Sequence, residues 1–63
     1  MTVEKKFRVN DMEYTARIWP EDDQYVVECV ENGVTSQGDD EEDALRMIAE
    51  AVELYLEPDE EVA

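Results

Sequence analysis

Hydrophobic and polar residues alternate through the first third of the chain, which predicts β-strands. Asn10-Asp11 interrupts the alternation and is typical of a two-residue turn, because both residue types tolerate left-handed backbone. Pro20 ends the second segment, since it has no amide hydrogen for a strand ladder. We therefore predict a β-hairpin over residues 2–19. Its apolar face is formed by Val3, Phe7, Val9, Tyr14, Ala16 and Ile18.

A third strand is predicted at residues 24–30, after a polar loop at residues 21–23. Apolar residues occupy both of its faces, which is typical of a strand that is central in its sheet or partly covered on its outer side. One face carries Tyr25, Val27 and Cys29, and the other carries Val26 and Val30. The turn residues 31–33 then precede a short fourth strand at residues 34–37, which Gly38 ends.

A helix is predicted to follow Asp40, whose carboxylate can cap the first turn. Acidic residues at 41–43 suit the positive end of the helix dipole, and Pro58 marks the far end. The helical period places one apolar stripe against the sheet: Ala44, Leu45, Ile48, Ala49, Val52, Tyr55 and Leu56. An adjoining apolar flank consists of Met47, Ala51 and Leu54. This flank either packs on the chain's own loops or N-terminal strand, or contacts a second chain.

These elements predict an α+β fold: a three- to four-stranded antiparallel sheet, in the order β-β-β-(β)-α, with one C-terminal helix packed on one face. Residues 1–57 form a single domain in this scheme. Residues 58–63 form an acidic tail that we expect to be disordered.

The charge of the chain changes the functional picture. Nineteen acidic residues against five basic ones give a formal net charge of −14, most of it in the second half. Such a field repels phosphate backbones, so we expect no direct binding of nucleic acid. It attracts basic proteins and speeds their encounter. Adaptation to a salty, halophilic cytoplasm explains the same composition equally well, and both explanations stay open.

The residues for catalysis or metal binding are sparse. The chain has no histidine, so Ser36 has no obvious base, and Cys29 falls on an apolar strand face where thiols are usually inert. The acidic run at residues 39–43 lacks the order of a calcium loop and is better explained as a helix start. We predict no enzymatic activity, cofactor or metal site. The single cysteine and the lack of a long apolar stretch favour a cytoplasmic protein without membrane contact.

Residues 36–45, read Ser-Gln-Gly-Asp-Asp-Glu-Glu-Asp-Ala-Leu, and the continuation through residues 49–57 resemble the signature helix of HicB-type antitoxins. The spacing of Tyr14, Ala16, Ile18 and Tyr25-Val26-Val27 is similar to that of the family's second and third strands. Residues 30–33 depart from it, because they are shorter than the family's Pro-Asp-Leu-Pro-Gly segment. Family members also carry a C-terminal DNA-binding domain, which we expect this stand-alone domain to lack.

The resemblance implies a protein that sequesters a small basic HicA-type mRNA-cleaving toxin and that forms a homodimer or higher homo-oligomer. The alternative is an acidic structural or regulatory homo-oligomer of the same fold without a toxin. Trp19 points away from the core face and either contacts a partner or lies over its strand neighbours. The candidate partner-binding residues are Trp19, Asp39, Glu42, Arg46, Met47, Glu50, Glu53 and Leu54.

Overall fold

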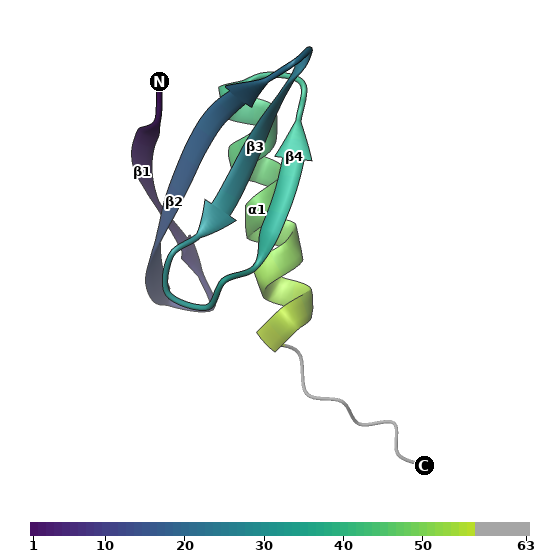
Figure 1. Cartoon of the computed structure of the whole chain (residues 1–63). Helices are drawn as coiled ribbons and strands as arrows, with labels where there is room; N and C mark the ends of the chain where they lie inside the picture. Colours follow the sequence, from purple (N-terminus) through teal and green to yellow (C-terminus); the bar gives the residue numbers. More distant parts are fainter. Residues whose placement is uncertain (57–63) are drawn as a thin grey trace.

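The computed structural model describes residues 1–56 and contains one antiparallel sheet followed by one helix on a single face (Figure 1). The elements are β1 (Val3–Val9), β2 (Met12–Glu21), β3 (Gln24–Cys29), β4 (Thr35–Gly38) and α1 (Glu41–Leu56). Each strand pairs with the next along the chain, so β2 and β3 are central. The predicted α+β class is therefore confirmed with four strands. The predictions for Pro58 and for the tail at 58–63 lie outside the described residues.

The turn between β1 and β2 has the predicted left-handed backbone. Asn10 and Asp11 have φ angles of 52° and 68°. Val9 pairs with Met12 across this turn. Two successive left-handed residues match the twist of the flanking strands, which fixes the register of the hairpin.

The end of β2 differs from the prediction, because the strand continues through Pro20 to Glu21. Backbone groups of successive strand residues point to alternate sides. The carbonyl of Thr15 accepts from the amide of Val30 at 2.9 Å, so Thr15 faces β3 and Pro20, five residues later, faces the β1 side. Pairing with β1 has already ended opposite Ile18. The missing amide of Pro20 therefore costs no ladder hydrogen bond.

The boundaries of β3 and β4 each differ by one residue from the prediction. β3 ends at Cys29 and β4 begins at Thr35. The amide of Cys29 donates to the Val34 carbonyl at 2.7 Å, and the amide of Gly33 donates to the Cys29 carbonyl at 2.8 Å. These bonds close a turn in which Gly33 has a φ of 78°.

Gly38 does more than end a strand. It is the last residue of β4, pairs with Tyr25 and is buried. A Cβ at this position would lie 2.5 Å from the backbone nitrogen of Ala44 and 2.8 Å from the carbonyl carbon of Asp43. The first turn of α1 therefore crosses directly over β4, and only glycine leaves room for this approach.

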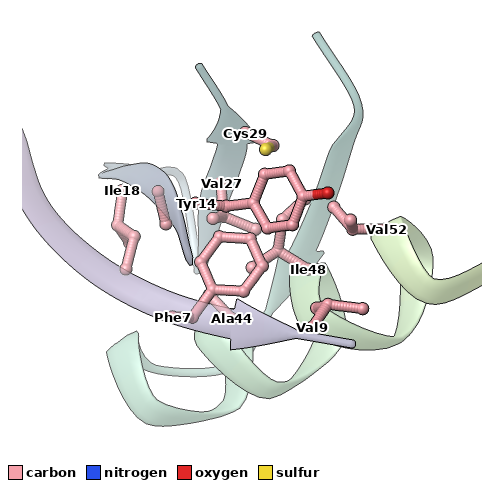
Figure 2. Packing of buried hydrophobic residues seen from close by; sticks show 10 residues of the cluster. Phe7, Val9, Tyr14, Ile18, Val27, Cys29, Ala44, Ile48 and Val52 are labelled. Atoms are coloured by element: carbon pink, nitrogen blue, oxygen red, sulfur yellow. The ribbon is translucent and has the colours of Figure 1, made fainter. Parts of the chain in front are cut away.

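The core lies between the sheet and α1 (Figure 2). Phe7 and Tyr14 contribute neighbouring rings whose centroids are 5.7 Å apart. The buried apolar side chains are Phe7, Val9, Tyr14, Ala16, Ile18, Val27, Cys29, Ala44, Ile48 and Val52. The predicted apolar faces of β1, β2 and β3 are thus the faces that α1 covers.

The last turn of α1 departs from the predicted stripe. Tyr55 and Leu56 were expected to pack on the sheet, but they are 60% and 39% exposed. A 16-residue helix is about 24 Å long. It packs mainly over β4 and β3, whereas the four residues of β4 span only about 13 Å. The helix therefore runs past the sheet, as Figure 1 shows.

Candidate protein-binding surface

The start of α1 is held by side chains of its own first turn. The Asp40 carboxylate accepts from the Asp43 amide at 2.7 Å, which is the predicted cap. The Asp43 carboxylate in turn accepts from the Asp39 amide at 2.9 Å. These two bonds satisfy backbone donors on both sides of the helix start and fix the direction in which the chain enters α1.

Asp43 also pairs with Arg46, the only basic residue after residue 17. The hydrogen bond from the Asp39 amide lowers the pKa of the Asp43 carboxyl, and the nearby charge of Arg46 lowers it further. Asp43 therefore stays ionised at neutral pH. Its charge is partly neutralised by Arg46, whereas the Asp39 and Glu42 side chains have no described ion pair and are exposed.

The fold gathers two acidic segments at one end of the molecule. The turn between β2 and β3 and the start of α1 lie at this same end, because β4 runs back toward the turn and pairs Gly38 with Tyr25 (Figure 1). We call this the acidic end, and it consists of Glu21, Asp22, Asp23, Asp39, Asp40, Glu41, Glu42 and Asp43. Lys5, which lies 4.0 Å from Glu41, contributes a nearby positive charge.

An acidic stripe continues from this end along one side of α1. Its members are Glu42, Arg46, Glu50 and Glu53, all of which are exposed. Two shallow hollows lie beside it. The first, about 510 Å³, is lined by Asp39, Asp40, Glu42, Asp43 and Arg46. Its lining carries four carboxylates against one guanidinium, so it favours a cationic group.

The second hollow, about 270 Å³, lies between α1 and the end of the β1–β2 hairpin. Glu50 and Glu53 line it from the helix, while the hairpin and the helix interior supply an apolar floor of Val9 and Ala49. Arg8, Asn10 and Arg46 complete the lining. This hollow has balanced charge and suits a long side chain with an aliphatic stem and a polar head.

The structure brings together five of the predicted partner-binding residues and separates the others. Asp39, Glu42, Arg46, Glu50 and Glu53 all line one or both hollows. Met47 and Leu54 lie on the adjoining flank of the same helix, where Met47 is half-buried and Leu54 is 68% exposed. The third member of that flank, Ala51, packs against the core.

Trp19 belongs to a different surface. It alternates with the buried Ile18, so it lies on the sheet face that α1 does not cover. It pairs with Val26, and both residues are half-buried. Trp19 and the acidic stripe of α1 therefore lie on opposite sides of the sheet.

Some residues of the surface were not predicted from the sequence. Asp40 and Asp43 were assigned only to the helix start, although they also line the first hollow. Their spacing to Arg46 was a visible signal for Asp43, because residues three apart are neighbours on a helix. Arg8, Val9 and Asn10 line the second hollow from a distant strand, and no local pattern in the sequence indicates that contact.

A second carboxylate has a structural role. Glu31 accepts from the Thr15 amide at 2.8 Å and from the Thr15 hydroxyl at 2.9 Å. The bond from the amide lowers the pKa of the Glu31 carboxyl. The thiol of Cys29 lies 3.7 Å from the same carboxylate. Burial raises the pKa of that thiol, so it stays protonated at neutral pH.

In the part of the chain that the structure describes, no three His, Cys, Asp or Glu side chains are arranged to hold a metal ion. Within residues 1–56, no helix combines the length and apolar character needed to cross a bilayer.

Comparison with known proteins gives one family. The chain matches, over residues 5–63, the family described as "Family of unknown function (DUF7387)". The chain belongs to this family. Neither the curated proteins nor the solved structures returned a match. The family description states no function, so the resemblance to HicB-type antitoxins stays a prediction.

Proposed function

We propose that this member of the DUF7387 family is a non-catalytic protein-binding module, and that the acidic end together with the acidic stripe of α1 binds a basic protein surface. The observation that carries the proposal is the first hollow, where Asp39 and Glu42 are exposed beside Asp40 and Asp43. Carboxylates arranged on a capped, well-anchored helix start can meet Lys and Arg side chains with little ordering cost. Complementary charge then supplies both specificity and rapid association.

The partner class that we propose is a small basic HicA-type toxin in the cytoplasm. Support comes from the resemblance of residues 36–57 to the HicB signature helix and from the net charge of −14. A protein that cleaves mRNA must present a basic surface to phosphates. An acidic domain that covers this surface would block the RNA and stop the cleavage.

The basic partner is first captured from host lysate at the native salt concentration and is then produced separately. The test measures the affinity of this chain for the isolated partner. The variant Asp39→Asn with Glu42→Gln removes two exposed charges without touching the Asp40 cap. Its matched control, Glu4→Gln with Glu13→Gln, removes two exposed charges from β1 and β2. We expect the first variant to weaken the complex roughly tenfold and the control to change it less than about twofold.

Two further readouts decide the mechanism. Raising KCl from 0.1 M to 1 M should weaken the complex steeply, because exposed charges are screened. RNA cleavage by the partner should stop on binding and return with the Asp39/Glu42 variant. A complex that is indifferent to salt, or that responds equally to both variants, would show that the acidic surface is not the binding site.

The alternative is a homo-oligomer of this fold whose acidity reflects a salty cytoplasm. Thermal melts in rising KCl test the explanation for the charge. A large gain in melting temperature would indicate that self-repulsion is being screened. A flat response would remove the halophilic explanation.

A further inference from the structure

The end of the molecule opposite the acidic end exposes apolar side chains. It is formed by the β1–β2 turn, the segment after β3 and the last turn of α1, which the antiparallel order brings together (Figure 1). Apart from Met1, these segments hold every large exposed hydrophobic residue among residues 1–56. They are Met12 (58% exposed), Leu54 (68%), Tyr55 (60%) and Leu56 (39%), together with Val30 (49%), and we call them the apolar end. Val30 alternates with the buried Cys29, so it contributes from the side of the sheet that α1 does not cover.

The apolar end contains few residues, so an interface that it forms is small. Exposed apolar patches of about 300–600 Å² are the largest that monomers commonly carry, and such patches often have a binding role. Two copies that met through the apolar end would form a contact near the lower limit for specific interfaces, which is about 1,000 Å² in total. A 63-residue domain also has a small core, for which association with a second copy is a common remedy.

Charge determines how two copies can meet. Contact through the acidic ends would bring two clusters of carboxylates together. Contact through the apolar ends holds those clusters apart by more than the length of β2 in each copy, about 33 Å for ten residues. We infer that the apolar end is the interface between two copies of this chain, related by a twofold axis. The arrangement leaves the acidic end and the acidic stripe as far as Glu50 free, so this inference does not depend on the proposed partner.

The same geometry predicts how salt acts on the dimer. Asp11, Glu31 and Glu53 lie near the rim of the apolar end and repel their counterparts across the twofold axis. Salt screens this repulsion and strengthens apolar burial. The dimer therefore tightens with salt, in contrast to a complex with a basic partner.

The experiment is sedimentation equilibrium of the full chain from 5 to 500 µM, in KCl from 0.1 to 3 M. We expect a monomer–dimer equilibrium whose dissociation constant falls at least tenfold over this range. The variant Leu54→Gln with Tyr55→Gln should weaken the dimer at least tenfold at each salt concentration. Met47→Gln is the matched control, because Met47 lies on the same helix flank two turns earlier, and it should leave the dimer unchanged. The Asp39/Glu42 variant should also dimerise normally.

Each contrary result is distinct. A wild-type chain that stays monomeric in 3 M KCl overturns the inference, as does a Leu54/Tyr55 variant that dimerises like wild type. A dissociation constant that rises with salt would indicate an ionic contact instead. If the wild-type chain is monomeric and the Leu54/Tyr55 variant no longer binds the basic partner, the apolar end belongs to the partner-binding surface and the inference is wrong.

Discussion

Replacement of Gly38 by alanine tests whether close contact between α1 and β4 holds the domain together. The added Cβ would lie 2.5, 2.7 and 2.8 Å from the nitrogen and Cα of Ala44 and the carbonyl carbon of Asp43. All three are backbone atoms, so no side-chain rotation relieves the clash. Ala44 itself is fully buried against the sheet, so the helix start has to lift away from its packing.

The expected cost follows from this geometry. Overpacking of a core typically costs about 1–3 kcal/mol, and a clash with helix backbone belongs at the upper limit. A domain of 63 residues has a total stability of roughly 3–9 kcal/mol. A loss of about 3 kcal/mol would lower the melting temperature by roughly 12 °C or more, at about 4–8 °C per kcal/mol for this size.

Gly33→Ala provides the matched control. Gly33 has a φ of 78°, but a Cβ there meets no atom within 4 Å. Its replacement should cost only the left-handed strain, about 1 kcal/mol. Urea denaturation followed by circular dichroism, at one fixed KCl concentration, gives both values. If Gly38→Ala costs no more than Gly33→Ala, the tight crossing of α1 over β4 does not contribute to stability and the reasoning is wrong.

Three other predictions concern single side chains. Asp40→Ala removes the cap on the Asp43 amide and should lower the free energy of unfolding by about 1 kcal/mol, whereas Asp40→Asn should retain most of it. The folded-state pKa of Glu31 is lowered below its ordinary value of 4.5, so its stabilising effect is present above that value and is lost as the pH falls through the folded pKa. The difference in stability between wild type and Glu31→Gln, from urea titrations at pH 3 to 7, should therefore shrink below pH 4.5, and a constant difference would contradict a role for the charge. Cys29 is fully buried with a raised pKa, so a thiol reagent at pH 8 should react at least about a hundredfold more slowly with the native chain than with the urea-unfolded chain; equal rates would mean that β3 opens freely.

Local patterns were sufficient to predict most elements of the fold. Alternation located β1, β2 and β3, because side chains of a strand point to opposite faces with a period of two. The left-handed turn at Asn10 and Asp11 and the cap at Asp40 were also predicted, since both depend on bonds within a few residues. Pro20 was predicted wrongly as a strand end, because its tolerance depends on where β1 stops pairing.

The candidate surface was predicted only in part, because the sequence shows spacing within one helix but not packing between distant segments. Spacing along one helix was enough to group Glu42, Arg46, Glu50 and Glu53, because their relative positions depend only on the helical period. The contribution of Arg8 and Val9 to the second hollow arises from packing between distant segments. Alternation already placed Trp19 on the strand face away from the core. The structure shows that α1 covers the opposite face, which separates Trp19 from the helix residues with which it was grouped.

The sequence by itself therefore determined the strands, the helix, its cap, the apolar stripe as far as Val52 and the excess of negative charge, all of which depend on residue type and short-range periodicity. Only the tertiary structure decided how these parts divide the surface. The antiparallel order places the β2–β3 turn beside the start of α1, which creates the acidic end from two segments. The short β4 leaves the last turn of α1 beyond the sheet, which exposes Tyr55 and Leu56. Both results depend on the lengths and directions of packed elements, which a one-dimensional pattern does not contain.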